Sequence, residues 1–317
     1  MLKCVCSFLL LLVCLTFTAS AQDRRAALEF YERGRRQYAQ GNMDGAIANL
    51  TQAIELFTRP QGHSRRRGEE WRSNLEQGDA TPMIDRIKLV DPLAAGAYSD
   101  RSLARYAEGD LEGALLDCDV AISINPGLAV AYNNRGTLHW AKQNLEAALA
   151  DFNRVIAIDP QEGDAYSNRA NVRIDMGDLD GGLVDLDKAV ALSPRNAKIY
   201  CNRGHARRTK KDVDGAYDDF DRAIALDRRL VEGYIGRALA HYDRYDLDRS
   251  IRDFSRAIEI DPRSARAYGC RGLVRLQQGH ESEAKRDFET SFKLDPDLRP
   301  KLEQSVQIVR KAQGAER

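Results

Sequence analysis

The fold is decided by residues 131–160, AYNNRGTLHWAKQNLEAALADFNRVIAIDP. Ala148 and Phe152 lie four positions apart, the spacing of one face of an amphipathic helix. An earlier helical segment contains Gly136, whose missing side chain would let the second helix approach closely. The residues between the two segments are polar, and Pro160 ends the second one. The stretch therefore predicts two antiparallel helices joined by a short turn.

The same pattern recurs along most of the chain. Copies of it begin at intervals of 34 residues, at Ala97, Ala131, Ala165, Ile199, Gly233 and Ala267. A further copy begins at Glu29, which is 68 residues, or two periods, before Ala97. A single helix pair of this kind cannot bury its apolar faces alone, so the copies must stack on their neighbours. We therefore expect an all-α repeat array.

The details of the period resemble the tetratricopeptide repeat (TPR). These details are the 34-residue length, an aromatic residue followed by Gly or Ala, a Gly-Asp turn and a terminal Asp-Pro. The resemblance covers residues 27–57 and 95–298. It implies a right-handed superhelix, or α-solenoid, whose first helices line a concave face.

The period sets the expected boundaries. Seven repeats are predicted, at 27–57, 95–128, 129–162, 163–196, 197–230, 231–264 and 265–298. Residues 58–94 break the pattern because Pro82 falls where a second helix is expected, so we predict an insert or a degenerate repeat with a short helix near 83–90. Residues 299–317 are expected to form a C-terminal capping helix, with Leu302 and Val306 on its apolar face.

The first residues are expected to be a targeting segment. Lys3 precedes an apolar run from Val5 to Phe17, and Ala19 to Ala21 form a site of small residues. This order is typical of a secretory signal peptide over residues 1–21, which predicts a periplasmic or secreted protein. We expect no stable membrane span after cleavage, since the run is short. A retained signal anchor stays open as the alternative.

The composition argues against several function classes. Lys plus Arg and Asp plus Glu both total 48, and this balance argues against a nucleic-acid partner. Metalloprotease, phosphate-loop and nucleophile-elbow motifs are absent, so we expect no enzyme and no cofactor. Cys118, Cys201 and Cys270 are too widely spaced to indicate a disulfide framework or a metal site.

Cations and acids recur together at fixed repeat positions. One position holds Arg in all seven repeats: Arg33, Arg101, Arg135, Arg169, Arg203, Arg237 and Arg271. Four residues later stand Arg105, His139, Arg173, Arg207, His241 and Arg275. The second helices carry Asp117, Asp151, Asp185, Asp219, Asp253 and Asp287. The first repeat lacks both partners, with Gln37 and Asn49 instead. We therefore interpret the set as structural pairs across each helix pair; a cationic rail for an anionic polymer is the alternative.

A run of asparagines provides the main binding hypothesis. Asn134, Asn168 and Asn202 occupy one inward position of three successive repeats. An amide offers a donor and an acceptor, which suits an extended peptide backbone. The run resembles the asparagine ladder in the superhelix of O-linked N-acetylglucosamine transferases, although no glycosyltransferase domain follows. A local hydrogen bond that stiffens the repeat is the alternative interpretation.

Other inward positions complete the candidate site. Asn171 and His205 are expected to face the groove, and Tyr106 and Trp140 are candidate anchors for a ligand or packing residues between repeats. Lys198 fits one position of the carboxylate clamp of the TPR family, but most clamp positions are not matched and we reject that clamp.

Three functions follow from these patterns. The leading one is an exported scaffold that binds a partner protein or extended peptide in the concave groove. The others are binding of an anionic polymer or glycan through the arginine edge and the insert, and a structural assembly subunit.

Overall fold

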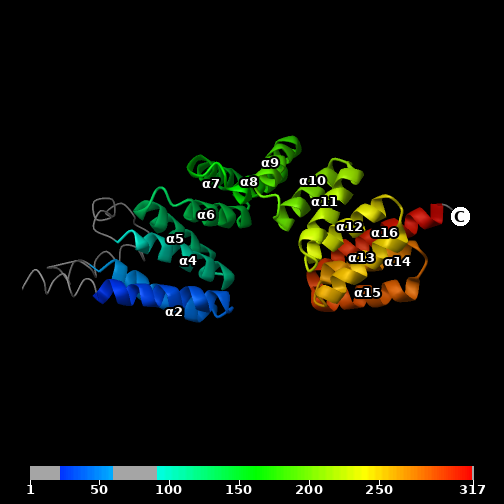
Figure 1. Cartoon of the computed structure of the whole chain (residues 1–317). Helices are drawn as coiled ribbons and strands as arrows, with labels where there is room; N and C mark the ends of the chain where they lie inside the picture. The colour runs from blue at the N-terminus through cyan, green and yellow to red at the C-terminus, as the bar shows by residue number, and fades with distance from the viewer. Residues whose placement is uncertain (1–21, 60–90, 316–317) are drawn as a thin grey trace, which may run out of the picture. The chain divides into compact units, whose positions relative to one another are not determined.

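The computed structural model describes residues 22–59 and 91–315, with side chains up to Lys311. The predicted signal peptide, the helix expected near 83–90 and the last two residues lie outside the described residues. The described part of the chain is all-α, and its helices follow one another in pairs (Figure 1). The prediction of an all-α array of helix pairs is thereby confirmed. The chain divides into two compact units, residues 1–160 and 161–317, and each is described separately.

The first unit begins with a helix over residues 22–39. It is followed by α2 (Met43–Phe57), α4 (Leu93–Ala107), α5 (Leu111–Ile124), α6 (Ala129–Ala141) and α7 (Leu145–Ile158). The second unit contains α8 (Gly163–Asp175), α9 (Leu179–Leu192), α10 (Ala197–Thr209), α11 (Val213–Leu226), α12 (Val231–Asp243), α13 (Leu247–Ile260), α14 (Ala265–Gln277), α15 (Glu281–Leu294), η3 (Pro296–Leu298) and α16 (Arg299–Ala315).

Local chemistry explains where the second helix of each repeat begins. Six of these helices start after an Asn or Asp whose side chain accepts a hydrogen bond from a backbone N–H in the first turn: Asn42, Asp110, Asn144, Asp178, Asp212 and Asp246. The turn before the cap needs a positive φ. Glycine supplies it at Gly41, Gly109, Gly177 and Gly279, whereas Gln143, Lys211 and Tyr245 adopt it as non-glycine residues.

Proline explains where several second helices end. The residues before Pro126, Pro160, Pro262 and Pro296 have ψ angles of 91–97°, outside the helical region. The proline ring disfavours a helical conformation of the preceding residue, so the helix stops there. The Asn-Pro or Asp-Pro dipeptide at these repeat ends therefore sets the residue at which the second helix stops.

Small and aromatic residues build the core of each helix pair. Phe152, Phe220 and Phe254 are fully buried on second helices. A Cβ on Gly136 would lie 3.0 Å from the Phe152 ring, and one on Gly204 would lie 2.8 Å from Phe220. The close approach expected at Gly136 is present, because any side chain there would collide with the aromatic ring.

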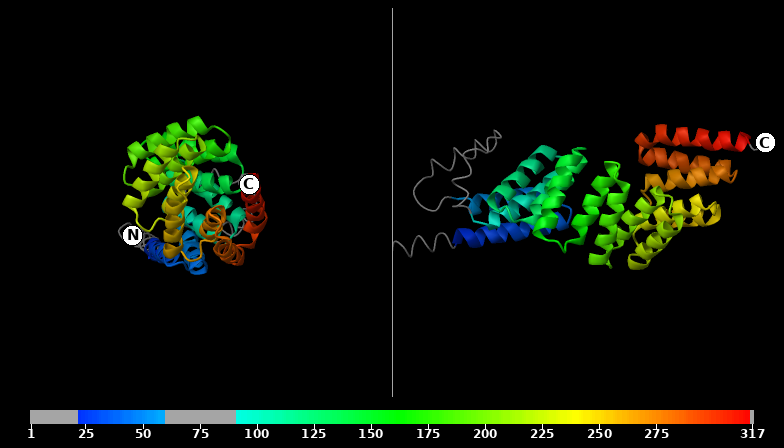
Figure 2. Two further views of the ribbon diagram at one scale, coloured as in Figure 1. Left: turned by 90° about the vertical axis from the view of Figure 1, so that its right-hand side faces the viewer. Right: turned by 90° about the horizontal axis from the view of Figure 1, so that it is seen from above.

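The last helix lies against the first helix of the last repeat. Figure 2 shows α16, in red, beside the orange helices, and its packing is with α14. Leu302 is buried on α16, and a Cβ on Gly269 would lie 2.7 Å from it. Val306 and Val309 are only half-buried. The apolar face expected for this helix is thus only partly covered.

None of the helices in the described residues combines the length and hydropathy that crossing a membrane requires.

Candidate functional site

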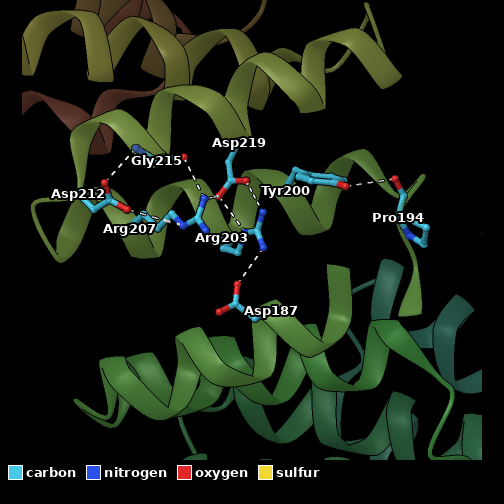
Figure 3. Close-up of polar contacts among 8 residues, drawn as sticks. All are labelled: Asp187, Pro194, Tyr200, Arg203, Arg207, Asp212, Gly215 and Asp219. Atoms are coloured by element: carbon cyan, nitrogen blue, oxygen red, sulfur yellow. Dashed lines mark hydrogen bonds and ion pairs between the residues drawn. The ribbon is translucent and has the colours of Figure 1, made fainter. Parts of the chain in front are cut away.

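The arginines of the first helices are held in a repeated network, drawn for one repeat in Figure 3. Arg203 Nε and Nη2 donate to the two carboxylate oxygens of Asp219 at 3.0 and 2.7 Å. Its Nη1 donates to Asp187 Oδ1 of the preceding repeat at 2.8 Å. Arg207 Nη1 donates to the same Asp219 at 2.9 Å. Such bidentate, charge-assisted contacts are strong and directional, so Arg203 joins two repeats.

This two-point contact recurs in six repeats. The equivalent bonds are all 2.6–3.0 Å long, in the pairs Arg101–Asp117, Arg135–Asp151, Arg169–Asp185, Arg203–Asp219, Arg237–Asp253 and Arg271–Asp287. The aspartates are 1–8% exposed. In the first repeat Asn49 Nδ2 donates to Gln37 Oε1 at 2.8 Å, so a neutral amide pair takes the place of the ion pair. The structural interpretation of the arginines is confirmed.

The third arginine nitrogen connects neighbouring repeats. In five repeats, Nη1 donates to an oxygen at one fixed position of the preceding second helix: Thr51, Asp119, Asp187, Asp221 and Ser255. Each of these guanidinium groups also lies 5.2–5.8 Å from the ring of the tyrosine three residues earlier. Each of these arginines is therefore ion-paired, in contact with an aromatic ring and partly buried along its stem. Little of its guanidinium group is left to bind an anionic polymer.

Two of the predicted asparagines link successive first helices. Asn134, on α6, is 5% exposed, and its Nδ2 donates to Ser99 O at 3.2 Å and Ser99 Oγ at 3.1 Å. Asn202, on α10, is half-buried and its Nδ2 donates to Ser167 Oγ at 3.0 Å. Asn168 is half-buried on α8. The local hydrogen bond of the alternative interpretation is therefore present at both ends of the run.

The same hydrogen bonds fix the orientation of the side-chain oxygen, Oδ1, of Asn134 and Asn202. Among the described residues, none donates a hydrogen bond to Oδ1 of Asn134 or Asn202. Since Nδ2 is anchored on a serine, the amide plane is held and Oδ1 is the group left to accept from a ligand N–H. The sequence analysis missed Ser99 and Ser167, which orient the amides. The available signal was that each serine stands one period and one residue before the asparagine that it binds.

His205 lies in a cationic part of the second unit. Its ring packs edge-on against Phe220, with centroids 4.9 Å apart. Burial, and then the charges of Arg266 and Arg208, lower the pKa of His205 to about 4. The same two arginines act electrostatically on Cys270, whose pKa is raised by burial. Arg208 and Arg266 therefore place positive charge beside a neutral imidazole, and Arg266 was not among the residues predicted from the sequence.

The remaining candidates differ in accessibility. Tyr106, on α4, is 41% exposed. Trp140 on α6 and Asn171 on α8 are half-buried, and Lys198 on α10 is exposed. Tyr242, at the position equivalent to Tyr106, packs against the core of α12 and α13. The side chain at this repeat position is thus exposed at Tyr106 and used for packing at Tyr242.

The thiols are held in an unreactive form. Burial raises the pKa of Cys118 and of Cys201 to about 12, and both side chains are buried. A thiol with such a pKa has almost no thiolate at neutral pH and is a poor nucleophile. In the described part of the chain, no three His, Cys, Asp or Glu side chains are grouped so as to hold a metal ion.

Comparison with known proteins agrees with this architecture. The family described as "Tetratricopeptide repeat" matches residues 129–162 and, in a second profile, residues 197–229. A tetratricopeptide repeat protein from Parabacteroides merdae ATCC 43184 is 18% identical, with 89% of this chain and 99% of that chain covered and a TM-score of 0.63. The pilF protein of Pseudomonas aeruginosa is 16% identical, with 64% and 92% covered and a TM-score of 0.55.

A third solved structure, the APC/C hetero-tetramer Cut9–Hcn1, is 12% identical, with 84% of this chain and 52% of that chain covered and a TM-score of 0.63. At these identities the likeness shows the fold alone. A search of curated protein sequences found no match.

Proposed function

We propose that this chain, a tetratricopeptide repeat protein, is an exported, non-catalytic scaffold that binds a partner protein or extended peptide along its first helices. Proteins with this repeat are generally protein-interaction scaffolds. Export rests on the signal-like residues 1–21 of the sequence. The binding mode rests on the anchored amides of Asn134 and Asn202.

The observation that carries the proposal is the anchoring of Asn134 and Asn202. Each amide gives its Nδ2 to a serine of the preceding first helix, at 3.0–3.2 Å. Each then presents a fixed Oδ1 acceptor. A fixed acceptor loses little side-chain entropy when it binds, so backbone N–H groups of an extended ligand are suitable partners. Such contacts recognise a backbone and read little of its sequence.

Positive charge in the second unit adds a preference for an acidic ligand to this binding mode. Arg208 and Arg266 both lie close enough to His205 to lower its pKa. Arg208 is already bonded to Asp243, at 2.5 and 3.1 Å, whereas Arg266 is exposed. We therefore expect the bound segment to carry an acidic side chain where it passes α10 and α14.

The two other functions have less support. The repeated arginines are committed to buried aspartates, so an anionic polymer would have to bind mainly through Arg65–Arg67, which lie outside the described residues. End-to-end assembly requires an apolar first face. Later repeats have small or apolar residues where the first helix has Glu29 and Arg36, both exposed. A charged outer face is typical of a repeat that ends an array.

The test is capture of partners by the full chain from the compartment in which it resides. The test variant is Asn134→Ala/Asn168→Ala/Asn202→Ala, and the control is Ser99→Ala/Ser167→Ala. The control removes the hydroxyl anchor of Asn202 and one of the two anchors of Asn134, and it keeps every Oδ1. A partner that is lost by the asparagine variant and bound more weakly, but not lost, by the serine variant supports the proposal. Equal retention by all three proteins contradicts it, and so does a steep fall of binding with salt, which would indicate many charge contacts.

A further inference from the structure

The last repeat leaves a core position partly uncovered. In six repeats the residue at one position of the second helix is completely buried: Leu50, Cys118, Phe152, Leu186, Phe220 and Phe254. The equivalent residue of the last repeat is Phe288, which is only half-buried. An aromatic ring of this size dominates core energetics when it is covered, so its exposure at the end of the array is a specific defect of packing.

The cause is the position of α16. In earlier repeats this core residue clusters with one position of the following first helix, in the pairs Cys118–Leu138, Leu186–Ala206, Phe220–Ala240 and Phe254–Val274. The period places Ile308 of α16 at that position, yet Ile308 is 62% exposed. Because α16 packs on α14 through Leu302, it does not cover α15 as a first helix would.

A groove of about 720 Å³ therefore lies between α15 and α16. Phe288, Phe292 and Val306 provide its apolar surface, and the two phenyl rings stack with centroids 6.4 Å apart. Arg299 lies over the Phe292 ring at 4.3 Å. Beside α5, α9, α11 and α13 the corresponding space is filled by the next first helix, so the shape suits a helix.

The rim of the groove is predominantly basic. Its charged residues are Lys285, Lys293, Arg299 and Arg310, with only Glu289 and Glu303 of opposite sign. The two acids are already beside Lys285, at 4.0 Å, and Arg299, at 3.5 Å. Among the described residues, neither Lys293 nor Arg310 has an acidic partner. An occupant that supplies acidic side chains would complete the pairing.

We propose that this groove binds an acidic amphipathic α-helix of a partner protein, at a surface that contains none of the candidate asparagines Asn134, Asn168 and Asn202. The helix places an apolar stripe on Phe288, Phe292 and Val306. Its acidic flank contacts Lys293 and Arg310. The chain's own first helix is a poor occupant, because it would bring the exposed charges of Glu29 and Arg36 onto these rings.

The probes are three labelled peptides of about 18 residues, long enough to form a helix on binding. They share one leucine stripe at helical spacing, and their flanks are Glu, Gln or Lys. Anisotropy titration of the full chain is expected to rank them Glu, Gln, Lys, with about a tenfold difference in Kd between first and last. Hydrogen exchange should slow in α15 and α16.

Matched variants identify the surface. Lys293→Glu/Arg310→Glu reverses the two unpaired rim charges and should weaken the Glu peptide about tenfold while strengthening the Lys peptide. Arg286→Glu/Lys311→Glu changes the same net charge on the same two helices at exposed positions outside the groove, and should leave all three affinities unchanged. If the first variant does not fold, as judged by circular dichroism, Val306→Lys replaces it, with loss of all three peptides expected.

Three results would overturn the proposal. One is no binding of any peptide up to about 100 µM, weaker than most specific contacts. Another is an equal effect of the groove and control variants. The third is self-association of the chain without peptide that Lys293→Glu/Arg310→Glu abolishes, because the occupant would then be a second copy.

Discussion

Arg203 and Asp219 lie 16 residues apart on the two helices of one repeat and meet through two hydrogen bonds of 2.7 and 3.0 Å. The carboxylate is 2% exposed, and the same arginine continues to Asp187 of the preceding repeat. A contact of this kind does not act as a ligand site. It sets the angle within one helix pair and the spacing to the next, and its repetition makes the array regular.

Removing the acid should therefore destabilise the second unit. Asp219→Asn leaves Arg203 and Arg207 without their shared carboxylate in a poorly solvated position, and we expect a loss of about 3 kcal/mol in the free energy of unfolding. Asp221→Asn is the matched control. Asp221 is exposed and accepts one bond from Arg237, so its loss should cost less than about 1 kcal/mol. Urea unfolding followed by circular dichroism measures both, and equal effects would contradict the structural role.

Acidification should weaken the second unit through His205. Its pKa is about 4 when folded, below the value of 6.5 for a free imidazole, because burial disfavours the charged form. Between these values the unfolded chain binds a proton that the folded chain does not, so stability is complete above pH 6.5 and falls towards pH 4.

The variant His205→Gln lacks this group. The difference in unfolding free energy between the two proteins should change over that pH range and be constant above it. A difference that is constant throughout would show that His205 titrates normally.

Thiol chemistry should report on folding. Burial raises the pKa of Cys118 and Cys201 to about 12, so both should react with a thiol reagent at pH 8 far more slowly in the folded chain than in urea. The expected ratio of rates is at least about a hundredfold, since the thiolate fraction falls with each unit of pKa. Mass spectrometry of tryptic peptides separates the sites, and fast labelling of either cysteine in the native chain would contradict its burial.

The turn at Lys211 offers a simple gain in stability. Its φ is 68°, a left-handed conformation that a side chain disfavours, and Lys211 is exposed. Lys211→Gly should raise the free energy of unfolding by about 1 kcal/mol. The reverse change at the equivalent turn, Gly177→Ala with φ of 90°, should lower it by a similar amount. Thermal unfolding checks both, and the same sign for the two variants would show that φ is not the cause.

The candidate site was only partly predictable. Asn134 and Asn202 were found because they occupy the same repeat position, and His205 because it lies three residues after Asn202. The hydrogen bonds of the two asparagines and the pKa of His205 were not predicted, because they depend on how close the neighbouring helices lie. Ser99 and Ser167 are ordinary polar residues in the sequence and acquire a role only when the next helix brings an amide within 3.0–3.2 Å.

The sequence by itself determined the helix pairs, their turns and the pairing of Arg with Asp. These features depend on residues that are close in the chain or repeated at a fixed period, such as Pro160 after Asp159 or Arg203 with Asp219. Tertiary structure alone decided the third bond of Arg203 to Asp187, the orientation of Asn202 and the partial exposure of Phe288. The physical reason is that each depends on the angle and separation between neighbouring helices, which packing of the whole surface sets and no local pattern encodes.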